Sequence, residues 1–196
     1  MRTFLLPLSL LILSSASAAP STFTVVGGKE DLTLMTVESE TSVENFTGRT
    51  SNVTGTVTFD PATRTGRGTI IVNGASIRTG MALRDEHMRS AGWLNFDKVP
   101  TLRFQTTSVK HVSGDAYEVR GNLTLNGVTR PVTTRATVKL TPANAATKAA
   151  GLKGDALAIT TAFPVKLSDF GVKNASIDGG RVNNTLQVAL KFIASN

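Results

Sequence analysis

The sequence predicts an all-β protein whose antiparallel strands form a sandwich or a barrel. Apolar and polar residues alternate with period two along several segments, turn residues separate these segments, and runs of helix-forming residues are few. The chain has 196 residues, of which 40% are hydrophobic, so it is long enough for one domain with its own core. We therefore expect a single domain over residues 19–196, without internal repeats.

The first 18 residues have the composition of a secretory signal peptide. Arg2 supplies a positive charge, residues 4–13 are apolar, and Ala16 and Ala18 are small residues at the two positions that a signal peptidase reads. The apolar run is short for a bilayer span. We therefore expect cleavage after Ala18 and export to the periplasm or the extracellular space. A buried N-terminal helix is the alternative.

The clearest strand pattern is a hairpin between residues 117 and 140. Its first strand places five residues on one face: Tyr117, Val119, Gly121, Leu123 and Leu125. Asn126 and Gly127 follow, and this pair is typical of a tight turn that requires positive φ. We expect the partner strand over residues 128–140, with an inward face made of Val132, Ala136 and Val138.

Other segments complete the predicted sheet. Residues 56–59 and 68–72 form two more strands, with a turn over residues 60–66 between them. Residues 80–92 lack alternation and are rich in helix formers, so we expect a short helix near residues 80–91. Residues 141–154 are expected to form a mobile loop or a single helical turn. The C-terminal strand has an apolar face made of Leu186, Val188, Leu190 and Phe192.

The composition excludes several classes of site. Cysteine is absent and the histidines are His87 and His111, which excludes disulfide scaffolds, cysteine zinc sites, iron–sulfur clusters and centres with several histidines. Asp85, Glu86 and His87 carry ligand groups, but consecutive helical residues point in different directions, so we expect no metal site. No Gly-x-Ser-x-Gly elbow occurs. We expect no enzymatic activity and no required cofactor.

The basic charge leaves two interpretations open. Lys and Arg number 21 against 14 Asp and Glu, a net charge of +7. Nucleic-acid binding is disfavoured by the expected export and by the scattered positions of Lys and Arg. Transient attraction to an anionic membrane surface is one interpretation, and a solvated cationic surface is the other. The sequence is compatible with a monomer or a homodimer.

Three motifs in order resemble a known family. Residues 84–90 (RDEHMRS) are followed by residues 98–104 (KVPTLRF), then by residues 121–132 (GNLTLNGVTRPV), and last by residues 168–172 (SDFGV). Together they resemble the signature of the YceI-like polyisoprenoid-binding family. The resemblance covers roughly residues 22–193. One departure is Leu167, where the family usually has Arg.

The resemblance implies a lipocalin-like antiparallel barrel of about eight strands. Its apolar lumen would hold an isoprenoid-type lipid or quinone for transport, storage or sequestration, and a barrel of this size has room for one slender ligand. We expect the ligand-binding residues to be Phe59, Ile71, Met81, Met88, Trp93, Leu102, Phe104, Leu123, Val138, Phe163, Phe170, Leu190 and Phe192. Strand patterning does not distinguish a hollow barrel from a filled one. The alternative is therefore a stress-related structural or interaction module with a filled barrel and no ligand.

The predicted helix supplies the candidates for contact with a polar head group. Arg84 and His87 are three residues apart and lie on one helix face, and Arg89 is near them. Their donors suit a phosphate or a quinone head group at the mouth of the barrel. The alternative is a solvated surface on which Asp85 pairs with Arg89.

Overall fold

The computed structural model describes residues 19–196, and the expected signal peptide lies outside the described residues. The sheet contains ten strands in this part of the chain: β1 (Ser21–Val25), β2 (Thr33–Glu40), β3 (Asn45–Thr50), β4 (Val53–Asp60), β5 (Thr65–Asn73), β6 (Thr101–Ser113), β7 (Ala116–Leu125), β8 (Val128–Thr141), β9 (Ala156–Lys166) and β10 (Thr185–Ser195). The short helices are η1 (Gly74–Ser76), α1 (Ala82–Arg89), α2 (Ala145–Ala149), η2 (Leu167–Phe170) and α3 (Ala175–Asp178). Within residues 19–196, none of the helices is long and apolar enough to cross a membrane.

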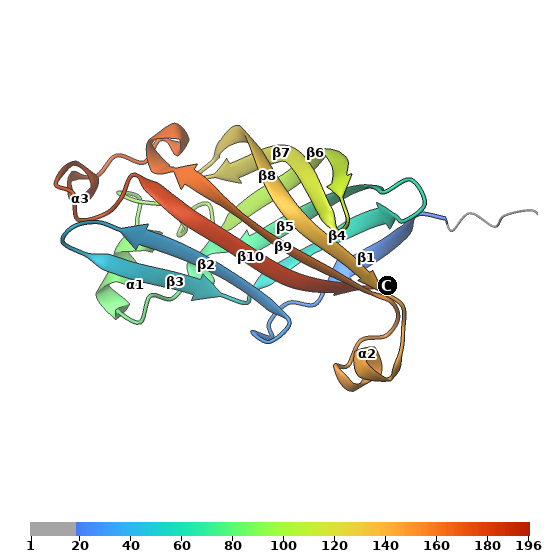
Figure 1. The fold of residues 1–196 in the computed structure, drawn as a ribbon. Coiled ribbons are helices and arrows are strands. Elements are labelled where there is room, and N and C mark those ends of the chain that lie inside the picture. Colours follow the sequence, from blue (N-terminus) through green and yellow to red (C-terminus); the bar gives the residue numbers. More distant parts are fainter. Residues whose placement is uncertain (1–18) are drawn as a thin grey trace, which may run out of the picture.

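Eight of these strands close into an antiparallel barrel. The order β1-β4-β5-β6-β7-β8-β9-β10 is completed by a pairing of β1 with β10, through Val25 and Ala194. The remaining pair, β2 and β3, is a hairpin that extends the sheet from β10. The predicted all-β, lipocalin-like barrel of about eight strands is confirmed, with this hairpin as an addition (Figure 1).

The barrel has a closed end and an open end because β1 and β2 share the same edge of β10. Strand β1 pairs with Ala194 and Ser195, whereas β2 pairs with residues 187–192. Between them the chain turns, and the Thr33 hydroxyl donates a hydrogen bond to the Val26 carbonyl at 2.6 Å. The other edge of β3 carries only an isolated bridge between Arg49 and Arg78 in the described sheet. The ring therefore separates at the end where α1 and α3 lie, opposite the C-terminus (Figure 1).

The local elements follow the sequence pattern closely. The predicted hairpin is β7 and β8, and its turn residues Asn126 and Gly127 have φ of 50° and 73°. The helix expected near residues 80–91 is α1. Of the two alternatives for residues 141–154, the structure has the helical one, α2, because Asn144 caps its first turn in a capping box with Thr147.

The closed end is filled by large side chains. Phe23, Phe59, Tyr117, Leu157 and Phe192 are all buried there. The rings of Phe59 and Tyr117 meet edge to face, with centroids 6.0 Å apart, which is a favourable aromatic geometry. Burial raises the pKa of the Tyr117 hydroxyl. This packed half supplies a rigid base for the open half.

Candidate functional site

A cavity of about 390 Å³ occupies the open end of the barrel. Its wall is made of the inward faces of the strands: Ile70, Phe104 and Leu123 lie side by side across β5, β6 and β7. Val37, Val188 and Phe163 do the same across β2, β10 and β9. Pockets for small ligands usually measure about 300–1,000 Å³ and are mostly apolar. This cavity therefore has the size and the lining of a binding site.

The exposure of strand β10 shows where the barrel changes from filled to hollow. Its inward residues alternate with outward ones, as the sequence predicts. Leu186, Phe192 and Ala194 are buried, but Val188 and Leu190 between them keep accessible surface although they point inward. Inward side chains remain accessible only where the opposite wall does not reach them. The structure thus shows a barrel that is hollow at this end and not filled.

A glycine sets the position of one aromatic ring in the wall. Gly121 belongs to the inward face of β7, and a Cβ atom at this position would collide with the ring of Phe104 on β6. The ring of Phe104 therefore occupies the space that a side chain at position 121 would fill. In this position Phe104 forms part of the cavity wall.

The structure places most of the predicted ligand-binding residues in the cavity wall. These are Met81, Met88, Trp93, Leu102, Phe104, Leu123, Phe163 and Leu190, together with the head-group candidates Arg84 and His87. Trp93 follows α1, and Phe104 and Phe163 come from strands. The sequence pattern and the family resemblance therefore identify residues that the fold brings together around one space.

The other predicted residues lie outside the wall. Phe59, Val138 and Phe192 are buried at the closed end, and Phe170 is buried within η2. Ile71 points to the other face of β5, because Ile70 and Val72 face inward. Because three apolar residues follow one another here, the sequence does not show which of them face inward. Arg89 lies in the last turn of α1 and is not part of the wall.

Some residues of the wall were not predicted from the sequence. Met35 and Val37 alternate along β2, so a period-two count would have found them. Leu167 is also in the wall, at the position where the family usually has Arg. Glu44 and Arg181 lie in connecting segments, where no periodic signal marks a residue as part of a site.

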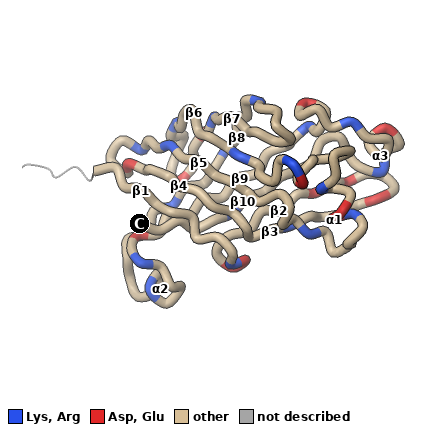
Figure 2. Tube along the Cα trace, turned by 180° about the vertical axis from the view of Figure 1, so that it is seen from behind, with Lys and Arg blue, Asp and Glu red and all other residues tan. Residues whose placement is uncertain are grey.

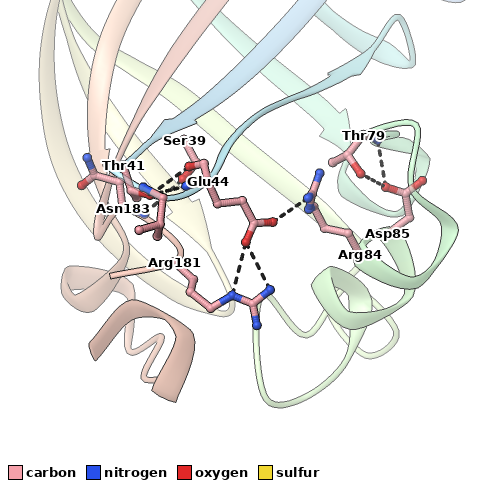
Figure 3. A network of polar contacts seen from close by, with 9 residues as sticks. Ser39, Thr41, Glu44, Thr79, Arg84, Asp85, Arg181 and Asn183 are labelled. Carbon is pink, nitrogen blue, oxygen red and sulfur yellow. Dashed lines mark hydrogen bonds and ion pairs between the residues drawn. The ribbon is translucent and has the colours of Figure 1, made fainter. Parts of the chain in front are cut away.

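The mouth of the cavity carries a network of charged side chains centred on Glu44 (Figure 3). The guanidinium group of Arg84 donates from Nη2 to Glu44 Oε1 at 2.6 Å. Arg181 donates from Nε to Glu44 Oε2 at 3.3 Å. The guanidinium carbon of Arg84 also lies 4.3 Å from the centroid of the Phe46 ring, a cation–π arrangement. The network joins the β2–β3 turn, α1 and the segment before β10.

These contacts determine the charge at the mouth. The hydrogen bond from Arg84 lowers the pKa of Glu44 below its ordinary value of 4.5, the charge of Arg181 acts in the same direction, and burial opposes both. Glu44 is therefore ionised at neutral pH. Two guanidinium groups face one carboxylate, so the network carries a net charge of +1.

Polar contacts on either side position this network. The Asp85 carboxylate is buried and accepts hydrogen bonds from the Thr79 amide at 2.8 Å and from the Thr79 hydroxyl at 2.7 Å (Figure 3). The surface alternative, in which Asp85 pairs with Arg89, is therefore not what the structure shows. In the β2–β3 turn, the Glu44 amide donates to the Thr41 hydroxyl at 2.9 Å. Both contacts fix segments that present the charged groups.

Curated relatives match part of the chain. A UPF0312 protein of Pseudomonas paraeruginosa is 40% identical over 129 residues, which is 64% of this chain and 63% of that relative. Protein YceI of Salmonella arizonae is 47% identical over 83 residues, which is 42% of this chain and 43% of the relative. The aligned part thus spans 63% of the length of the first relative and 43% of the length of the second.

Solved structures share the fold. The crystal structure of Burkholderia cenocepacia BcnA has a TM-score of 0.71 at 21% identity, over 84% of this chain and 96% of that one. A polyisoprenoid binding domain from Saccharophagus degradans has a TM-score of 0.64 at 14% identity, over 88% and 97%. The family model of the YceI-like domain matches residues 21–194. The chain therefore belongs to the YceI-like domain family.

Proposed function

We propose that this protein binds one amphiphile with an isoprenoid-type tail, an isoprenoid lipid or quinone, and holds it without chemical change for transport, storage or sequestration. The observation that carries the proposal is the apolar cavity of about 390 Å³ at the open end of the barrel. One solved neighbour is named as a polyisoprenoid binding domain, which supports the same class of ligand.

The apolar wall supplies the free energy of binding. Burying one five-carbon unit removes on the order of 100 Å² of apolar surface from water, which stabilises the complex by about 2.5 kcal/mol. A few such units outweigh the cost of ordering a flexible chain. The wall requires no specific polar partner for the tail, so the fit depends on length and width. No cofactor is needed for this role.

The mouth supplies the contacts for the head group. Arg84 is part of the charged network and His87 lies in the wall with it, and Arg181 is the most exposed member of the network, with 69% of its side chain accessible. Guanidinium donors can donate hydrogen bonds to quinone carbonyl oxygens, and they bind anionic oxygens more strongly. The tail would therefore enter first and the head group would remain at the mouth.

Export and membrane contact complete the proposal. The signal peptide expected at residues 1–18 would direct the chain to the periplasm or the extracellular space. There the protein would meet membranes that contain isoprenoid amphiphiles. Figure 2 shows Lys and Arg spread over the whole molecule, so any attraction to anionic lipids is diffuse.

The test is the identity of the co-purified ligand. Residues 1–196 are expressed in bacteria, and the exported protein is purified without detergent. It is then extracted with organic solvent, and the extract is analysed by mass spectrometry. We expect one class of isoprenoid amphiphile in near-stoichiometric amount, unchanged after incubation with the protein. An empty extract, together with no saturable binding of a fluorescent prenyl probe, contradicts the proposal.

A further inference from the structure

Exposed apolar side chains gather at the mouth of the cavity. Within residues 19–196, the large apolar residues with high exposure are Val43, Met81, Leu83 and Val112, between 51% and 72% accessible. Val43 is in the β2–β3 turn, and Met81 and Leu83 are at the start of α1. Glu44 directly follows Val43, and Arg84 directly follows Leu83. The ion pair between Glu44 and Arg84 therefore holds the β2–β3 turn against the start of α1. We call Val43, Met81 and Leu83 the apolar rim.

The rim is continuous with the interior of the cavity. Met81 and Leu83 belong to the cavity wall although more than half of each side chain is exposed to solvent. An apolar surface thus runs from the outside of the molecule into the lumen. A tail that follows this surface meets little water on its way.

We propose that the apolar rim is a membrane-docking surface, which inserts into the boundary between head groups and acyl chains of a bilayer that contains anionic lipids. Its role, the direct passage of the amphiphile between bilayer and cavity, rests on the proposed function. The docking itself does not, because it is measured without cargo. Amphipathic segments bind at this depth through buried apolar area together with attraction to anionic lipids.

Two features favour a bilayer over a second copy of the chain. The rim consists of three side chains on two separate segments, whereas a stable protein interface has about 20–30 residues on each side. The charged network beside the rim has a net charge of +1, which matches anionic head groups. Charges of both signs lie around α1 and α3 (Figure 2), so apolar insertion contributes more than charge.

The test is co-sedimentation of the full mature chain with vesicles of phosphatidylcholine and phosphatidylglycerol. We expect Val43→Ser and Leu83→Ser each to weaken vesicle binding about fivefold, and the double variant to weaken it further. The matched control is Val112→Ser, because Val112 is also 51% exposed but lies on β6 ten residues beyond the wall residue Leu102, roughly 30 Å along the strand. The control should bind vesicles like the wild type.

A second measurement separates docking from cargo binding. Val43 is not part of the cavity wall, so Val43→Ser should bind a short soluble prenyl alcohol, such as geraniol, as the wild type does. Loss of vesicle binding without loss of geraniol binding supports the docking surface. If no variant of the chain binds geraniol but Val43→Ser still loses vesicle binding, the docking surface stands and the proposed function fails.

Two results overturn the inference. One is a wild-type protein that does not sediment with the vesicles, or rim variants that sediment as well as Val112→Ser. The other is a concentration-dependent dimer, seen by analytical ultracentrifugation, that Val43→Ser and Leu83→Ser dissociate. The second result would assign the rim to another copy of the chain.

Discussion

Replacing Val188 by Phe tests whether the cavity is vacant space. Val188 lies in the middle of β10, between Val37 and Phe163, and its side chain points into the cavity while keeping accessible surface. The larger side chain adds four carbon atoms. At about 0.8 kcal/mol for each buried carbon they would contribute about 3 kcal/mol if fully packed. Because the cavity is open at the mouth, we expect about a third of this, a stabilisation of about 1 kcal/mol.

The assay compares the ligand-free variant with the wild type in two ways. Chemical denaturation should show the gain of about 1 kcal/mol, and thermal unfolding should show a rise of about 2–4 °C for a domain of this size. Binding of a fluorescent prenyl probe should weaken at least about tenfold, because the ring takes space that the tail needs. Stability and binding thus change in opposite directions.

The matched control is Gln187→Phe on the outer face of the same strand. Gln187 is exposed and lies outside the cavity wall, so the same ring there should leave prenyl binding unchanged. If Val188→Phe instead costs about 1–3 kcal/mol, the usual result of overpacking a full core, the space is not vacant. Retained binding in a stabilised variant would also refute the reasoning, since the tail would then lie elsewhere.

Further predictions concern four polar or small residues that stabilise the fold near the cavity or far from it. Asp85→Ala should destabilise the protein by about 1–2 kcal/mol, measured by chemical denaturation, because two donors of Thr79 lose their buried acceptor; Asp85→Asn should restore part of the loss. Wild type and Glu44→Gln should differ in stability at pH values above 4.5 and converge as the pH falls through the lowered pKa of Glu44, because protonation ends its ion pairs; a difference that persists at pH 3 would contradict this account. Asn144→Ala should cost about 1 kcal/mol through loss of the α2 cap and leave prenyl binding unchanged, since α2 lies at the end opposite the cavity. Gly121→Ala should displace the Phe104 ring, destabilise the protein by about 1–3 kcal/mol and weaken prenyl binding, measured by denaturation and probe titration.

The strands that alternate cleanly could be predicted from the sequence alone. Along β7 and β10 the residues predicted to face inward do so, because one face is buried and the other is solvated, although Ala194 on β10 was not among them. Where this contrast fails, the prediction fails too. The run Ile70-Ile71-Val72 is apolar on both faces of β5, so the pattern gave no reason to choose Ile70 and Val72 over Ile71.

The division between a filled and a hollow half could not be predicted from the pattern. Phe192 and Leu190 occupy equivalent inward positions on β10, yet one is buried at the closed end and the other lines the cavity. Both residues pair with β2, but Phe192 lies two residues from Ala194, where β1 joins β10 and closes the ring, and this closure depends on pairing between distant segments. Glu44 and Arg181 meet for the same reason, 137 residues apart in sequence.

The shared edge of β10 has a consequence for how this barrel tolerates change. The half closed by β1 contains the packed residues Phe23, Phe59 and Tyr117, which leave no space between them for a ligand. The half next to β2 and β3 surrounds empty volume, and substitutions in it forfeit fewer packing contacts. Wall side chains that keep accessible surface, such as Val188 and Leu190, can therefore vary in size at a smaller cost in stability than the buried residues. Under the proposed function, substitutions confined to that half would adapt the barrel to ligands of different length and width without changing the packed half.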